Sequence, residues 1–251
     1  MSLRYDKNYT FYNSGIKPWI IVLMGPVGVG KTTIRKYLVL SLRKRGIKAR
    51  GSYIRLNHAF AYLFLLTVTK ILHCKGPEPI STLGRYNSHI FVRLFPLWKY
   101  FMTLSLVIMY LIRVYLPYRI LKRTVVIEDY LPVTACDLIW VATWFGIPLK
   151  SLLKELSMIL RLLTKSSIRI VRLEASHETL IRRWSIRGSF ERDKSYMSDN
   201  FAYIRFHEAC TNVLLKSLSF NDIIILDTNN IRVSEVIKTI CNLIRVNTRQ
   251  E

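Results

Sequence analysis

Acidic residues are scarce in this chain. It has 16 Asp and Glu residues against 38 Lys and Arg residues, so its formal net charge is +22. Between Lys7 and Ile127, the one carboxylate is Glu78. A field of this sign attracts polyanions, which include nucleotides, nucleic acids and anionic lipid headgroups. Charge alone does not choose among them, and a basic surface that serves solubility is the simpler alternative.

Cysteine is also sparse, and no two cysteines form a C-x-x-C pair. The four are Cys74, Cys136, Cys210 and Cys241. This spacing argues against a zinc site or a disulfide framework and fits a reducing, cytoplasmic location. The five histidines are isolated, without the spacing of metal ligands. No apolar stretch follows a basic start, so we expect no secretory signal, and residues 1–18 are interpreted as an N-terminal lead-in.

Long uncharged apolar runs are absent as well. The segment 57–123 is basic and apolar, yet Tyr100–Ile112, the uncharged core of its part Ile90–Lys122, has only thirteen residues. A transmembrane span needs about 20, and Pro96 and Pro117 predict breaks or a kink. We therefore expect apolar helices over Asn57–His73 and Ile90–Lys122 that pack in the core. Two alternatives remain, an anionic membrane surface and a homodimer formed through these helices.

The most informative feature is a glycine-rich motif between Gly25 and Thr32. It matches G-x-x-x-x-G-K-[ST], the phosphate-binding P-loop. An apolar strand precedes it and a helical pattern follows it, so several N–H groups are expected to surround one point that suits a polyphosphate. The predicted nucleotide-binding residues are Gly25, Gly28, Val29, Gly30, Lys31, Thr32 and Thr33. Lys31 is expected to contact the β/γ-phosphates of ATP, and the Thr32 hydroxyl to ligate Mg²⁺.

Five short apolar runs predict strands, and helical patterns separate them. The runs are Trp19–Met24, Lys48–Ile54, Thr124–Glu128, Ile168–Leu173 and Asp222–Leu226. Alternating strands and helices are typical of an α/β fold with a parallel sheet covered on both faces. Together with the P-loop, they predict one three-layer P-loop NTPase domain over residues 19–247, with a five-stranded parallel sheet. The Pro- and Gly-containing segment Cys74–Asn87 is interpreted as a loop.

The third predicted strand ends in two acids, Glu128 and Asp129. In open α/β sheets, ligands bind beyond the carboxyl ends of the strands. Asp129 is our first choice to hold Mg²⁺ or to orient the acceptor. Glu128 is the alternative, because successive side chains on a strand point to opposite faces.

Arginines are clustered after the fourth predicted strand. Arg183 and Arg187 are four residues apart on one predicted helix face, and Arg192 follows Gly188. Arginines on a closing segment neutralise charge on a transferred phosphoryl group, so residues 183–200 are predicted to form a lid with these three arginines. The alternative is an exposed basic helix.

The order of these features resembles the thymidylate kinase branch of the P-loop nucleoside-monophosphate kinases. The resemblance implies that Lys31 and Thr32 meet phosphate and Mg²⁺, and that Asp129 is the aspartate of an Asp-Arg-aromatic motif. It also implies that the segment containing Arg183, Arg187 and Arg192 closes over ATP. By this resemblance, the chain is expected to transfer the γ-phosphoryl group of ATP to a nucleoside monophosphate or a related acceptor.

Three positions depart from that family's pattern. Tyr130 stands where the motif has arginine, and Val27 stands where the P-loop often has an acid. The stretch around Val107 and Ile108, where an arginine usually meets the acceptor, is apolar. Fold and ATP binding are therefore implied more firmly than thymidylate as the acceptor. The alternative function is a P-loop ATPase or nucleotide switch that acts at a membrane surface or on a protein partner. We find no nucleic-acid-binding module.

Overall fold

The computed structural model describes residues 18–54, 59–76, 79–163, 168–186, 201–218 and 223–246. Residues 1–17 of the predicted lead-in and residues 187–200 of the predicted lid lie outside this part of the chain.

A five-stranded sheet forms the centre of the fold, in the order β2-β3-β1-β4-β5, and every neighbouring pair is parallel. The strands are β1 (Ile20–Met24), β2 (Ala49–Tyr53), β3 (Thr124–Glu128), β4 (Ile168–Glu174) and β5 (Ile223–Asp227). Each lies within one or two residues of the run predicted from the sequence. The predicted α/β fold class is thus confirmed.

Side chains of the central strand alternate between two hydrophobic cores. Ile20, Val22 and Met24 belong to one core, and Ile21 and Leu23 belong to the other. All five are at most 1% exposed, as expected for a parallel strand that helices cover on both faces.

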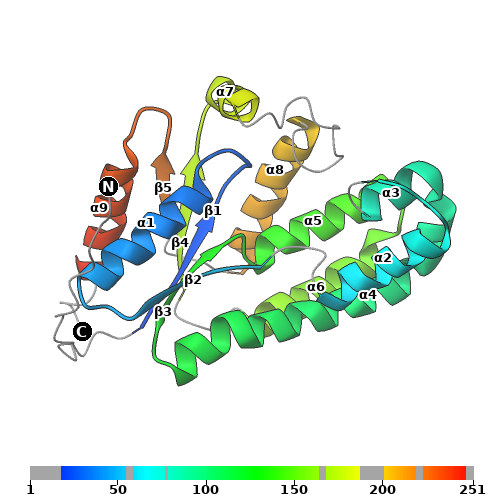
Figure 1. Ribbon diagram of the computed structural model, residues 1–251, viewed down its shortest axis with the longest axis horizontal. Coiled ribbons are helices and arrows are strands. Elements are labelled where there is room, and N and C mark those ends of the chain that lie inside the picture. Colours follow the sequence, from blue (N-terminus) through cyan, green and yellow to red (C-terminus); the bar gives the residue numbers. More distant parts are fainter. Residues whose placement is uncertain are drawn as a thin grey trace.

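Helices cover both faces of the sheet. Figure 1 shows α1 and α9 on one side of it and α5 and α8 on the other. The helices are α1 (Lys31–Lys44), α2 (Ala59–Ile71), α3 (Pro79–Tyr86), α4 (Ser88–Tyr110), the π-helical η1 (Leu111–Ile120), α5 (Leu131–Trp144), α6 (Leu149–Leu163), α7 (His177–Ile186), α8 (Phe201–Ser217) and α9 (Val233–Val246). The segment Cys74–Asn87, interpreted as a loop from its Pro and Gly content, contains α3. This interpretation was wrong for residues 79–86.

The prolines of the long apolar segment do not end its helix. Pro96 lies inside α4, and Pro117 lies inside η1, which follows α4 without a gap. Proline has no N–H, so Pro96 leaves the carbonyl of Val92 without its helical donor, but both residues are solvent-exposed and water can replace that bond. Around Pro117 the helix widens, and the N–H of Leu121 donates to the carbonyl of Leu116, five residues earlier, at 3.0 Å.

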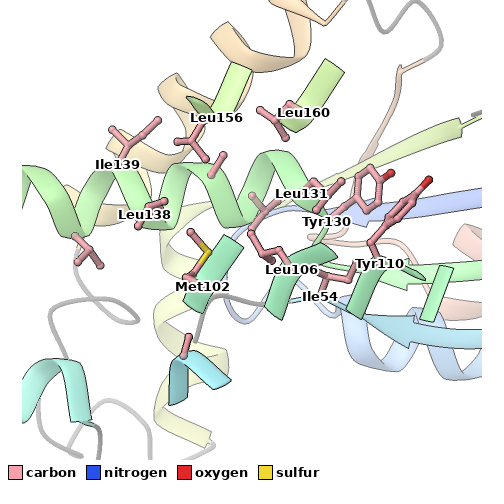
Figure 2. Packing of buried hydrophobic residues seen from close by; sticks show 14 of the residues in the cluster. Ile54, Met102, Leu106, Tyr110, Tyr130, Leu131, Leu138, Ile139, Leu156 and Leu160 are labelled. Carbon is pink, nitrogen blue, oxygen red and sulfur yellow. The ribbon is translucent and has the colours of Figure 1, made fainter. Parts of the chain in front are cut away.

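α5 lies in the larger core between α4 and α6 (Figure 2). Met102 and Leu106 of α4 and Leu156 and Leu160 of α6 belong to the same buried cluster. At the start of α5, Tyr130 is fully buried, and burial, followed by the nearby Tyr110 hydroxyl, raises the pKa of its own hydroxyl well above the usual value. The inner face of α4 therefore packs in the core as the sequence predicted.

The central strand provides a test of core packing. Leu23→Ala removes a fully buried side chain, so we expect the free energy of unfolding to fall by about 2–5 kcal/mol. Leu40→Ala on α1 is the matched control, because Leu40 is 43% exposed, and it should change stability much less. Urea unfolding followed by circular dichroism measures both. Equal losses for the two variants would contradict this account of the core.

Candidate nucleotide-binding site

The P-loop joins β1 to α1 and contains three glycines with positive φ, because Gly30 at the start of α1 has a φ of 102°. Gly25 and Gly28 have φ angles of 142° and 90°, which other residues rarely adopt. A Cβ on Gly25 would lie 2.3 Å from the carbonyl oxygen of Leu173, and one on Gly28 would lie 2.6 Å from the indole nitrogen of Trp184. β4 and α7 therefore pack directly against the backbone of the loop.

Lys31, the first residue of α1, is held inside the loop. Its Nζ donates to the carbonyl oxygens of Gly25 at 2.6 Å and Pro26 at 3.1 Å. The same nitrogen lies 3.4 Å from the Asp129 carboxylate. Lys31 is only 8% exposed, so the cation is already surrounded by oxygen acceptors, an environment that phosphate oxygens can reproduce.

Thr32 contacts the end of β3. Its hydroxyl donates to Oε1 of Glu128 at 2.5 Å, and Nε of Arg35 lies 3.3 Å from Oε2 of the same carboxylate. Glu128 is 3% exposed. The sequence offered Glu128 only as the alternative to Asp129, yet Glu128 is the acid that meets the predicted metal-binding hydroxyl. The neighbouring Asp129 has a φ of 53°, and its carboxylate lies near Lys31 instead.

Two adjacent side chains of α7 form hydrogen bonds to the backbone of the P-loop. The Arg183 guanidinium donates to the carbonyl oxygens of Gly28 at 3.4 Å, Val29 at 3.3 Å and Thr228 at 2.7 Å. The Trp184 indole N–H donates to the carbonyl oxygen of Val27 at 2.9 Å. Arg183 was predicted as a lid arginine that meets phosphate, but here its guanidinium binds main-chain oxygens of the loop. Arg187 and Arg192 lie outside the described residues, so their predicted role stays a prediction.

A buried polar cluster joins α5 and α8 near the P-loop, and sequence reasoning missed it. The Tyr203 hydroxyl donates to Oδ1 of Asp137 at 2.5 Å, and Nε2 of His207 lies 3.9 Å from the same oxygen. Burial, followed by the positive charge of Lys31, lowers the pKa of His207 to about 4. Burial, followed by the charge of Asp137, raises the pKa of Tyr203. In the sequence, the only available signal was the spacing of Tyr203 and His207, one helical turn apart.

The donor set fits a magnesium nucleotide. Among the described residues, no group of three or more His, Cys, Asp or Glu side chains could hold a metal by itself. Mg²⁺ in phosphoryl-transfer sites uses only one or two protein oxygens and takes the rest of its ligands from substrate phosphates and water. Thr32 provides one such oxygen beside the loop that is predicted to hold the phosphates, and Glu128 accepts the hydrogen bond of its hydroxyl.

Comparison with known proteins supports the fold. No protein-family model matches the chain, and no curated relative is found by sequence. A solved structure of thymidylate kinase from Candida albicans matches with a TM-score of 0.55 over 94% of each chain, at 12% sequence identity. The chain therefore has a thymidylate kinase-like P-loop fold.

The buried His207 predicts how stability depends on pH. Between pH 6.5 and about 4, the unfolded chain binds a proton at this imidazole that the folded chain excludes. The free energy of unfolding should fall as the pH is lowered through this window, by at most about 1.4 kcal/mol per pH unit from this group. In His207→Gln this contribution should be lost. Urea unfolding at several pH values measures it, with the exposed His89→Gln as control. An unchanged slope in His207→Gln would contradict the assignment.

Proposed function

We propose that the chain transfers the γ-phosphoryl group of ATP–Mg²⁺ to a nucleoside monophosphate or a related acceptor. The observation that carries this proposal is the convergence of Lys31, Thr32 and Glu128 at the carboxyl ends of β1 and β3. The thymidylate kinase-like fold supports it, because ligands of such sheets bind at this edge.

Phosphoryl transfer asks a protein mainly to position phosphates and to neutralise charge. The ammonium group of Lys31 would exchange the carbonyl oxygens of Gly25 and Pro26 for phosphate oxygens. The Asp129 carboxylate would keep this ammonium group directed into the loop. Bound Mg²⁺ would neutralise charge on the phosphates. Thr32 would offer its hydroxyl oxygen to the ion, and Glu128 would orient that oxygen by accepting the hydrogen bond of the hydroxyl.

The carboxylates of β3 have separate roles in this proposal. Glu128 serves the metal side of the site through Thr32, and Asp129 serves the phosphate side through Lys31. If Glu128 is aligned with the acid of the thymidylate kinase motif, then the Asp-Arg-aromatic pattern corresponds to Glu128, Asp129 and Tyr130. Asp129 then stands in the place of the arginine, which reverses the charge at that position.

Arg183 is a positioning residue in this scheme. It holds the carbonyls of Gly28 and Val29, so the N–H groups of the loop can face the phosphates. Arg187 and Arg192 keep their proposed part as lid arginines that stabilise the transferred group.

The acceptor is proposed only as a class. The helices that would border it supply apolar residues and tyrosines, and Tyr110 and Tyr130 are both buried in the core (Figure 2). The Candida albicans thymidylate kinase is described as having broad substrate specificity. A panel of purine and pyrimidine monophosphates is therefore the appropriate first test. An ATPase would instead release phosphate without any acceptor, and the same assay distinguishes the two.

Lys31→Ala tests the phosphate site. Loss of this cation should lower transfer from labelled ATP by about a hundredfold, because no other described side chain of the loop carries a positive charge. Lys36→Ala is the matched control, since Lys36 is exposed on the same helix. Circular dichroism confirms folding, because Lys31→Ala leaves Asp129 without this partner. Wild-type transfer by Lys31→Ala would refute the role of Lys31, and ATP binding without transfer to any acceptor would refute the kinase proposal.

A comparison of Glu128→Gln with Asp129→Asn tests the division between the two acids. Glu128→Gln keeps an acceptor for Thr32 but removes the charge, so we expect turnover to fall and the half-saturating Mg²⁺ concentration to rise by about tenfold. Asp129→Asn should weaken ATP binding with a smaller change in the Mg²⁺ requirement. Steady-state titrations with Mg²⁺ measure both. A larger rise in the half-saturating Mg²⁺ concentration for Asp129→Asn than for Glu128→Gln would assign the metal-side role to Asp129.

A further inference from the structure

The outer face of α4 and η1 exposes a continuous row of large apolar side chains. We name as the outer stripe Leu97, Tyr100, Leu104, Leu111, Leu116 and Ile120, which are between 38% and 64% exposed. They recur every three to five residues with one longer interval, as expected for one face of a helix that widens after Tyr110. This helical rod lies along the lower edge of the molecule in Figure 1.

The rod is long and apolar enough to cross a membrane, but its inner face prevents this. Ser88–Ile120 spans 33 residues, and only a third of its most apolar window is buried. Trp98, Met102 and Val114 of the inner face are at most 2% exposed and belong to the larger core. A spanning rod would have to leave that core, whereas a rod that lies flat on a surface keeps it intact.

The charged residues around the outer stripe indicate which kind of surface it can bind. Arg93 and Arg119 are exposed at its two ends, and Lys122 and Arg123 follow. No carboxylate occurs among the described residues between 59 and 127. Glu155 of α6 pairs with Lys99 of the rod at 2.7 Å.

We propose that the outer stripe is a docking surface for an anionic lipid bilayer, on which the protein lies with α4 and η1 in the interface. Apolar side chains bordered by arginine and lysine are what such a surface binds, and tyrosines such as Tyr100 favour the headgroup region. A second copy of the chain is a poorer occupant, because packing stripe against stripe brings two basic surfaces together without an acid to pair them.

The neighbouring α2 extends this surface. Phe64 of α2 packs on Phe101 of α4 with ring centroids 5.2 Å apart, and the N–H of Ala61 donates to the Ser105 hydroxyl. α2 exposes apolar side chains of its own, of which Leu63 and Ile71 are 56% and 69% exposed. The two packed helices thus offer a wider apolar area than one helix alone.

Vesicle flotation of the full chain tests the proposal. The wild-type protein should float with vesicles of phosphatidylcholine and phosphatidylserine, and about tenfold less with phosphatidylcholine alone. The triple variant Leu97→Gln, Leu104→Gln, Leu111→Gln should bind the anionic vesicles at least about tenfold more weakly. Its matched control is the triple variant Leu40→Gln, Val213→Gln, Ile231→Gln, which replaces three exposed apolar residues of α1, α8 and the segment before α9 and should bind like the wild type.

A second pair of variants separates this docking from general charge attraction. Arg93→Gln with Arg119→Gln should weaken binding more than Lys216→Gln with Lys238→Gln, which removes the same charge from α8 and α9. Equal weakening by both pairs would overturn the proposal, as would wild-type binding by the triple leucine variant. Sedimentation that shows a dimer dispersed by that triple variant, with vesicle binding unchanged, would assign the stripe to a second copy. None of these readouts depends on phosphoryl transfer.

Discussion

Complete burial of β1 is the constraint on which the rest of the fold depends. Its five side chains are divided between two cores, so helices must cover both faces of the sheet. The P-loop follows this strand directly, and it packs against Leu173 of β4 and Trp184 of α7. A buried strand, a glycine loop with positive φ angles and a helix start therefore hold one position in space, which is the condition for a preorganised anion site.

The sequence predicted the sheet well because β1, β3 and β5 are short apolar runs. In β4, apolar residues alternate with Arg169 and Arg172, and β2 is the weakest case, because it contains Arg50, Gly51 and Ser52. The prediction failed at α3, where local Pro and Gly signals outweighed a helix that buries Ile80 and Leu83 against neighbouring helices. The prediction of helix breaks at Pro96 and Pro117 was wrong for a related reason. Pro96 and the Val92 carbonyl lie on the exposed side of α4, where water can replace the lost bond, and a widened turn in η1 accommodates Pro117.

The site was predicted less completely than the fold. The P-loop motif located Lys31 and Thr32, because loop geometry and residue type are linked in that motif. Which of the two acids contacts Thr32 depends on the backbone direction at the end of β3, where Asp129 takes a positive φ. The role of Arg183 could not be read either, since its partners are main-chain oxygens of Gly28, Val29 and Thr228 that lie far away in sequence.

The hydrogen bonds from α7 to the P-loop backbone affect which positions of the loop tolerate substitution. Arg183 donates to the carbonyl oxygens of Gly28 and Val29, and Trp184 donates to that of Val27, and every residue type provides a carbonyl oxygen. The exposed Val27 is therefore free to vary without loosening the attachment. Gly28 has no such freedom, because any added atom would push against the indole. Mutational tolerance within the loop should thus alternate sharply between neighbouring positions, following the backbone attachment and not the nucleotide.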